Sequence, residues 1–272
     1  MSKIPKEYII AVDAIVKASI KIMKVYNESF DVEIKSDGSP LTVADIESSK
    51  IIEAALQETQ IPITGEETKK GDYEIRKTWN KSWCVDPLDG TKEFVNRNGE
   101  FAVNIALIEK QTPIFGLIAS PVSEQILFGD KDLGVFTFSF DDAYIPSNWE
   151  KIKAKEIPNR PIGIVYSRSH SSGPMDEFIE EISAKYGEPT FVKKGSSLKF
   201  FDLALGKADV YPRFAPTMEW DIASGQAILN AIGGEVIHTE TKKPLFYNKE
   251  NLKNPSFIAS TKAILNNSDV KL

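Results

Sequence analysis

Apolar residues along the chain follow two different periods, and the two patterns alternate. Apolar positions three and four residues apart from Tyr8 to Tyr26 predict an amphipathic first helix, and a similar pattern from Thr42 predicts a second. Apolar runs at 102–108 and 114–119, with a short polar turn between them, are typical of neighbouring strands. Because helix and strand patterns interleave along the whole chain, the sequence predicts an α/β layered fold without internal repeats.

The second half of the chain continues this interleaving after a polar, proline-containing stretch at 141–161. That stretch is the best candidate for a lobe boundary, which divides the chain into an N-terminal α+β lobe, 1–145, and a C-terminal α/β lobe, 146–272. Beyond it the pattern predicts strands near 162–166, 190–192, 208–214, 235–238 and 255–260, and helices over 175–186 and from 220.

Composition narrows the class of protein. The chain has 272 residues, 42% of them hydrophobic and 26% charged, which is ordinary for a globular protein. A net charge of −6 without a long basic run argues against a broad nucleic-acid-binding face. A single cysteine, Cys84, excludes an internal disulfide, and only two histidines exclude a histidine-rich zinc site. With no apolar segment of membrane length, these features predict a cytoplasmic enzyme.

The stretch Trp83–Phe94 is where we expect the chemistry. An apolar run ends there in two carboxylates, Asp86 and Asp89, placed around Pro87, whose ring sets the direction in which the chain leaves the sheet. Gly90 permits a tight turn, and the amides of Gly90 and Thr91 form a plausible cradle for phosphate. A divalent cation bound between them would allow the two carboxylates and a phosphate to lie close together despite their like charges. The local alternative is an ordinary Asp-Pro-Gly turn at the end of a strand.

Three further carboxylates also lie where elements begin or end, and each has a local explanation. Asp45 stands at capping-box spacing from Thr42, so it either caps the second helix or polarises a metal-bound water. Glu66 belongs to a Glu-Glu pair that alone would be a solvated surface pair. Asp221 opens a helix and is explained as a capping carboxylate.

Taken jointly, Glu66, Asp86, Asp89 and Asp221 favour one shared metal site over separate surface roles. Hard oxygen ligands without clustered Cys or His favour Mg²⁺ or Mn²⁺ over zinc. Two such ions about 4 Å apart would activate water and neutralise the leaving oxygen in phosphoryl transfer, with Thr91 orienting the water. Gly195-Ser196-Ser197 with Lys199 is a helix entrance that could hold an anion, although serine capping competes as an explanation.

At these residues the chain resembles the lithium-sensitive inositol monophosphatase superfamily. The resemblance lies in G-E-E at Gly65, D-P-L-D-G-T at Asp86 and W-D-I-A-S-G at Trp220, and it runs over most of the chain. Within the superfamily it is closest to 3'(2'),5'-bisphosphate nucleotidases of the CysQ type, through G-T-K-E-F, S-R-S-H, G-S-S-L-K-F and Y-P-R-F. It implies a five-layer αβαβα sandwich, as in fructose-1,6-bisphosphatase.

The resemblance also implies roles for individual residues. It implies catalytic roles for Asp45, Thr91 and Glu66, of which Asp45 and Thr91 assist the nucleophilic water. It implies metal binding by Glu66, Asp86, the Leu88 carbonyl, Asp89 and Asp221. Substrate contacts are implied for these five ligands, for Gly90 and Thr91 at the scissile phosphate, and on the nucleotide side for Ser169, His170, Ser196, Ser197, Lys199 and Arg213.

The implied cofactor is Mg²⁺, as two or three ions, with Mn²⁺ as a substitute and Li⁺ as an inhibitor. The leading hypothesis is hydrolysis of the 3'-phosphate of adenosine 3',5'-bisphosphate, and also of the sulfated nucleotide, by a monomer or homodimer in the cytoplasm or at the inner face of the cell membrane. One departure matters, because Thr64-Gly65 stands where the nucleotidases often carry Leu-Ser. Inositol monophosphate hydrolysis, and a non-catalytic ligand-binding module of the same fold, therefore remain as alternatives.

Overall fold

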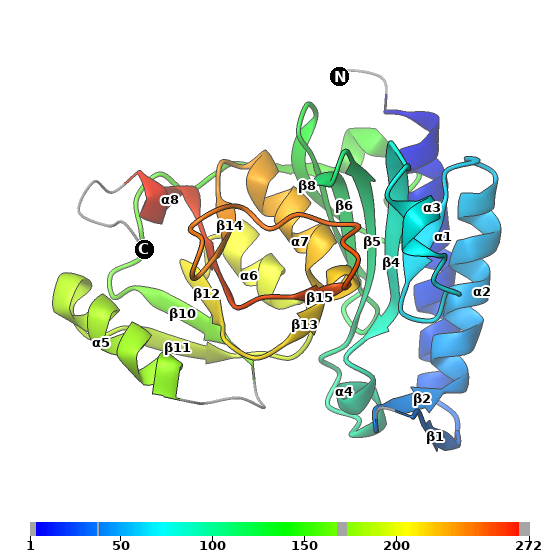
Figure 1. Cartoon of the computed structure of the whole chain (residues 1–272), viewed down its shortest axis with the longest axis horizontal. Helices are drawn as coiled ribbons and strands as arrows, with labels where there is room; N and C mark the ends of the chain where they lie inside the picture. Colours follow the sequence, from blue (N-terminus) through cyan, green and yellow to red (C-terminus); the bar gives the residue numbers. More distant parts are fainter. Residues whose placement is uncertain (1–3, 37, 168–172, 267–272) are drawn as a thin grey trace.

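The fold is built from helices and two β-sheets in alternating layers. In this computed structural model, residues 4–36, 38–167 and 173–266 are described. Figure 1 shows the layers from right to left: α1 (Lys6–Tyr26) and α2 (Val43–Gln57), a first sheet, α6 (Lys199–Ala204) and α7 (Glu219–Ala231), a second sheet, and finally α5 (Gly173–Tyr186) with α8 (Lys262–Leu265). The predicted αβαβα sandwich is confirmed.

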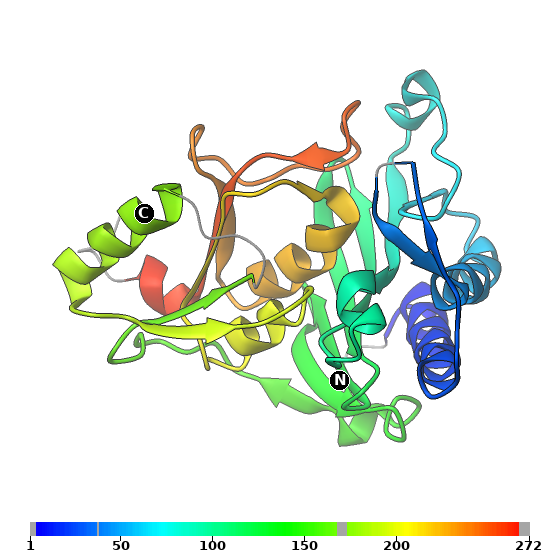
Figure 2. The ribbon, with the colours of Figure 1, turned by 90° about the horizontal axis from the view of Figure 1, so that it is seen from below.

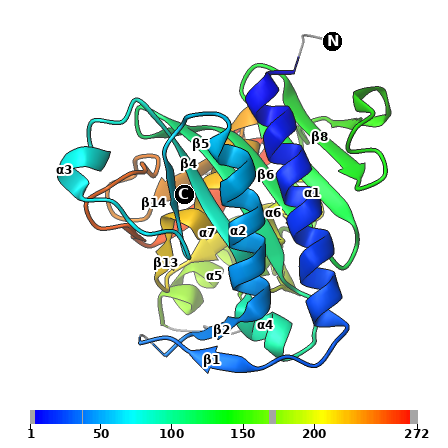
Figure 3. The same ribbon diagram turned by 90° about the vertical axis from the view of Figure 1, so that its right-hand side faces the viewer.

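The first sheet has seven strands in the order β3-β4-β5-β6-β7-β8-β9. Only β3 runs parallel to its neighbour, and the rest of the sheet is antiparallel. Helices α1 and α2 lie side by side across its outer face (Figure 3). Its strands are β3 (Ile63–Gly65), β4 (Lys81–Asp89), β5 (Ala102–Glu109), β6 (Thr112–Ser120), β7 (Gln125–Asp130), β8 (Gly134–Ser139) and β9 (Glu150–Ile152).

The second sheet has five strands in the order β11-β10-β12-β16-β14. Its strands are β10 (Gly163–Tyr166), β11 (Thr190–Lys193), β12 (Val210–Arg213), β14 (Glu235–His238) and β16 (Phe257–Ser260). Seen from below in Figure 2, α6 and α7 lie between the two sheets. The remaining short elements are β1 (Val32–Ile34), β2 (Pro40–Thr42), α3 (Tyr73–Arg76), α4 (Thr91–Val95), the 3₁₀ helix η1 (Pro146–Asn148), β13 (Thr217–Met218) and β15 (Lys253–Asn254).

Alternation along the strands divides the buried residues between layers. In β5, Val103, Ile105 and Leu107 face the core under α1 and α2, whereas Ala102, Ala106 and Ile108 face the core around α6 and α7. A third core lies under α5 and α8 on the far side of the second sheet. Because Cys84 of β4 belongs to the central core, Asp86, two residues further on, also points toward α7.

Helix α7 packs against the first sheet at glycine positions. A Cβ on Gly116 of β6 would lie 2.2 Å from the Ser224 carbonyl oxygen, and a Cβ on Gly129 of β7 would lie 2.6 Å from the Cα of Ile228. Only glycine permits these approaches without displacing the helix. The contact brings the first turn of α7, with Asp221, toward the ends of β4 and β5.

The segment 141–161, interpreted from its sequence as a polar boundary, has structure of its own. It contains η1 and β9, and β9 pairs with β8 in the first sheet. Trp149 between them stacks on Phe138 at a centroid distance of 4.0 Å, which anchors the segment to the first sheet. The division into lobes 1–145 and 146–272 stays a prediction.

Candidate active site

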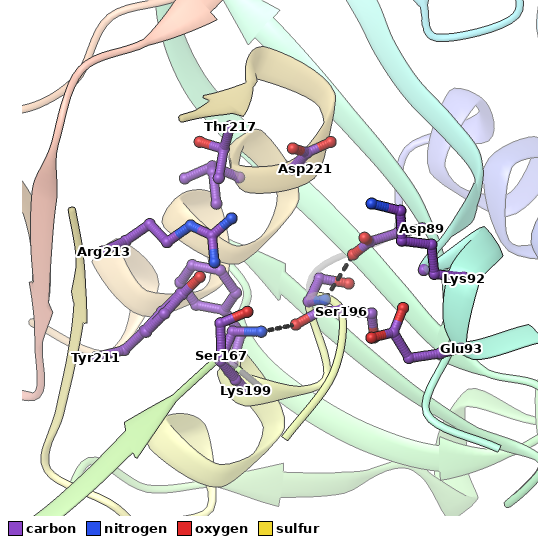
Figure 4. Close-up of a pocket in the computed structure, with 14 residues that line it drawn as sticks. Asp89, Lys92, Glu93, Ser167, Ser196, Lys199, Tyr211, Arg213, Thr217 and Asp221 are labelled. Atoms are coloured by element: carbon purple, nitrogen blue, oxygen red, sulfur yellow. Dashed lines mark hydrogen bonds between the residues drawn. The ribbon is translucent and has the colours of Figure 1, made fainter. Parts of the chain in front are cut away.

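A cavity of about 220 Å³ lies where β4, α4, α6, β12 and α7 meet. Figure 4 shows residues from both halves of the chain directed toward it, with Asp89 and Asp221 on one side and Lys199 and Arg213 on another. Of the residues predicted from the sequence, the wall includes Asp89, Gly90, Ser196, Ser197, Lys199, Arg213 and Asp221. The predicted Ser169 and His170 lie outside the described residues.

The end of β4 carries an irregularity between its two acidic residues, Asp86 and Asp89, each of which still pairs with a residue of β5. The β4–β5 register shifts between Asp86 and Asp89, which marks a bulge. The Asp86 carboxylate accepts a hydrogen bond from the Leu88 amide at 3.0 Å and so holds the loop closed. Gly90 follows at φ 92°, a left-handed conformation that favours glycine, and α4 begins at Thr91. The expected tight turn at Gly90 is confirmed.

Asp45 performs the capping role and also reaches Thr91. One carboxylate oxygen, Oδ2, accepts hydrogen bonds from the Thr42 amide at 2.8 Å and the Thr42 hydroxyl at 2.6 Å, which completes the predicted capping box. The other oxygen, Oδ1, accepts from the Thr91 hydroxyl at 2.9 Å, and that hydroxyl lies 3.3 Å from the Leu88 carbonyl. The two explanations of Asp45 are therefore compatible, because each uses a different oxygen.

The acidic residues raise one another's pKa values. Burial raises the pKa of Asp86 well above its usual range, and repulsion from Glu66, Asp89 and Asp221 adds to the effect. Burial and repulsion from Asp89 likewise raise the pKa of Asp221, although the Met218 amide donates a hydrogen bond to it at 2.9 Å. Such a cluster disfavours its own ionisation and gains from a nearby positive charge.

Lys35, which follows β1, supplies one such charge. Its Nζ lies 2.8 Å from Oε1 of Glu66 and also contacts Glu67. Burial opposes the charged form of Lys35, but its hydrogen bonds to Glu66 and Glu67 raise its pKa overall. Glu66 is thus paired with a lysine, and no group of three or more His, Cys, Asp or Glu side chains within 4–36, 38–167 and 173–266 could hold a metal ion as it stands.

The donor set nevertheless fits a hard divalent cation by its chemistry. The candidate ligands are carboxylates and the Leu88 carbonyl, without sulfur or imidazole, as Mg²⁺ prefers. Burial leaves Asp86 and Asp221 with raised pKa values, and only part of their oxygens is used in hydrogen bonds. A dication would supply the positive charge that the buried cluster lacks.

The opposite wall of the cavity is cationic. Lys199 is buried, and desolvation lowers the pKa of its ammonium group to about 8, while the nearby Asp89 charge opposes this shift. Its Nζ donates to the carbonyls of Lys194, at 3.2 Å, and Ser196. Arg213 donates from Nε to the Ala215 carbonyl at 3.1 Å and keeps its guanidinium at the cavity wall. Two cations therefore share one side of the cavity.

The sequence reasoning missed several residues of this wall. Lys92, Glu93, Tyr211 and Thr217 line the cavity although no role was predicted for them. Lys92 and Glu93 stand inside the G-T-K-E-F motif and Tyr211 inside Y-P-R-F, so the motifs themselves were the available signal. Asn104 of β5, which contacts Asp89 and Ser197, belongs to none of the motifs. Its neighbours in the sequence are apolar and do not indicate which distant residues it contacts.

Known proteins resemble the chain over most of its length. The inositol monophosphatase family matches residues 5–269. The 3'(2'),5'-bisphosphate nucleotidase CysQ of Escherichia coli strain K12 is 38% identical over 244 residues, which is 88% of this chain and 93% of that protein. The crystal structure of CysQ from Bacteroides thetaiotaomicron is 40% identical, with a TM-score of 0.83, and the alignment covers 93% of this chain and 96% of that one.

More distant structures agree in fold alone. The suhB protein of Bartonella henselae is 22% identical, with a TM-score of 0.76, and the alignment covers 96% of this chain and 95% of that one. The match over residues 5–269, the identity to the CysQ proteins and the observed layers lead to one conclusion. The chain belongs to the inositol monophosphatase family.

Proposed function

We propose that the protein is a Mg²⁺-dependent 3'(2'),5'-bisphosphate nucleotidase that converts adenosine 3',5'-bisphosphate to AMP and phosphate. The observation that carries this proposal is a single cavity with the carboxylates of Asp89 and Asp221 on one side and two cations, Lys199 and Arg213, on the other. A substrate with two phosphates needs two places for negative charge. The name of the Escherichia coli relative at 38% identity, 3'(2'),5'-bisphosphate nucleotidase CysQ, supports the same reaction.

The acidic side serves the phosphate that is cleaved. Glu66, Asp86, Asp89, Asp221 and the Leu88 carbonyl would hold Mg²⁺, which supplies an activated water and neutralises charge on the phosphate. The Thr91 hydroxyl, which donates to Asp45 at 2.9 Å, would orient the attacking water, and the Asp45 carboxylate would accept the proton through it. The left-handed Gly90 lets the backbone approach the phosphate closely.

The cationic side serves the phosphate that is kept. Lys199 and Arg213 offer charge-assisted hydrogen bonds, and Ser196 and Ser197 stand at the same wall. We propose that Ser169 and His170 also lie on the nucleotide side, with His170 in contact with the sugar or base; both lie outside the described residues. An inositol monophosphate would leave this second site empty, so the nucleotide uses more of the cavity.

Several finer properties belong to the same proposal. They are two or three Mg²⁺ ions per site, replacement by Mn²⁺, inhibition by Li⁺, action on the sulfated nucleotide, a monomeric or homodimeric state and a cytoplasmic location or one at the inner membrane face. No helix in the described ranges is long and apolar enough to cross a membrane.

Phosphate release from a substrate panel tests the proposal. Adenosine 3',5'-bisphosphate, adenosine 3'-monophosphate and inositol 1-phosphate are each incubated with Mg²⁺, with and without chelator. We expect the bisphosphate to have the highest kcat/KM and the chelator to abolish release. Preferential turnover of inositol 1-phosphate would move the assignment to an inositol monophosphatase, and no release from any substrate would favour a non-catalytic binding module.

A further inference from the structure

Asn104 is a buried polar residue that stands at the junction of three parts of the site. It lies in the middle of β5, directly opposite Asp86 of β4, and none of its surface is exposed to solvent. Residues opposite each other in an antiparallel pair point to the same face, so Asn104 and Asp86 both face α7. An uncharged amide there needs hydrogen-bond partners, because leaving buried polar atoms unpaired is costly.

Those partners come from three separate segments. The amide nitrogen of Asn104 lies 3.3 Å from Oδ2 of Asp89 and 3.4 Å from the carbonyl of Trp220, which directly precedes Asp221. Its amide oxygen accepts a hydrogen bond from the Ser197 hydroxyl at 2.7 Å. The Ser197 amide in turn donates to the same Oδ2 of Asp89 at 2.5 Å.

This arrangement occupies one oxygen of Asp89 and leaves the other without a hydrogen bond among the described residues. Two N–H groups directed at Oδ2 set the orientation of the carboxylate, and because Asp89 lines the cavity, Oδ1 is the oxygen left for a ligand there. A carboxylate that binds a metal is held in the same way, by hydrogen bonds from residues that do not touch the metal themselves.

We propose that Asn104 is a positioning residue that orients Asp89 for Mg²⁺ and fixes the Ser197 loop and the start of α7 relative to it. This inference rests on the proposed function, in which Asp89 is a metal ligand. Asn104 acts on Asp89 and Ser197 together, and therefore couples the metal side of the cavity to the side that holds the second phosphate.

The test measures Mg²⁺ binding by calorimetry on the full chain, without substrate. Asn104→Leu keeps the approximate size and removes all three hydrogen bonds, and we expect Mg²⁺ to bind about 10- to 100-fold more weakly. Gln226→Leu is the matched control, because Gln226 is also a buried amide, bonded to the Tyr247 hydroxyl and the Leu245 carbonyl. It should lower the unfolding temperature similarly and leave Mg²⁺ affinity unchanged. Asn104→Ser replaces Asn104→Leu if the latter does not fold.

A double-mutant cycle separates action through Asp89 from a general loss of structure. In an Asp89→Asn background, Asn104→Leu should cause no further loss of Mg²⁺ affinity. If the two substitutions weaken Mg²⁺ binding independently, so that their fold-losses multiply, the inference about Asn104 is wrong. Equal Mg²⁺ affinities for Asn104→Leu and Gln226→Leu would also overturn it, and neither result would affect the proposed function. Failure of the unchanged chain to bind Mg²⁺ would instead overturn the proposed function.

Discussion

Lys199 offers the sharpest test of the second phosphate site. The residue is 3% exposed, and desolvation lowers the pKa of its ammonium group to about 8. The charge that we assign to phosphate binding is therefore lost within an experimentally accessible pH range. Lys199→Met removes the charge and keeps most of the volume. A charge-assisted hydrogen bond contributes about 1.5–3 kcal/mol, which corresponds to a loss of roughly 10- to 150-fold in kcat/KM for the bisphosphate.

The pH profile of the unchanged enzyme provides a second measure. With a pKa near 8, about half of Lys199 is charged at pH 8 and about a tenth at pH 9, so kcat/KM for the bisphosphate should fall about fivefold between them. Dividing this value by kcat/KM for adenosine 3'-monophosphate removes effects on the metal and the attacking water. We expect the ratio to fall above pH 8 in the unchanged enzyme and to stay flat in Lys199→Met.

Stability should move in the opposite direction. The pKa of Lys199 is lower in the folded chain than its usual 10.5, so between about pH 8 and 10.5 the unfolded chain binds more protons and stability rises with pH. At pH 7 the buried charge is a cost, and Lys199→Met should raise the unfolding temperature while it weakens bisphosphate turnover. Equal losses of kcat/KM on both substrates, or a fall in the ratio that persists in Lys199→Met, would refute the reasoning.

Three other substitutions test the site and its supports. Asp89→Asn should abolish most Mg²⁺-dependent phosphate release without lowering the unfolding temperature, because it removes one charge from a repelling buried cluster; unchanged turnover would contradict its role. Gly116→Ala places a Cβ 2.2 Å from the Ser224 carbonyl and so displaces α7. It should lower the free energy of unfolding in urea by about 1–3 kcal/mol and should also lower phosphate release. Tyr8→Phe removes a buried 2.9 Å hydrogen bond to Asp130 and should lower the free energy of unfolding by about 1–3 kcal/mol with kcat/KM unchanged. A loss of activity would show that the core under α1 affects the site.

Local patterns in the sequence were sufficient for the elements and for much of the chemistry. The helical period over Tyr8–Tyr26, the Thr42 and Asp45 capping pair and the apolar runs of β5 and β6 each depend on neighbours a few residues away. The same holds for the turn at Gly90, where the bend, the acids and the glycine are adjacent. Such features are written in short stretches, so they can be recognised before the fold is known.

Only the tertiary structure determines the contacts between segments that are distant in the sequence. Ser197 reaches Asp89 across 108 positions. Asn104 reaches Trp220 across 116, because α7 packs on the sheet at Gly116. No local period encodes which buried asparagine meets which carboxylate, since that depends on strand register and on how closely a helix approaches. The pairing of Lys35 with Glu66 and the low pKa of Lys199 likewise arise only from burial and from charges that the fold brings together.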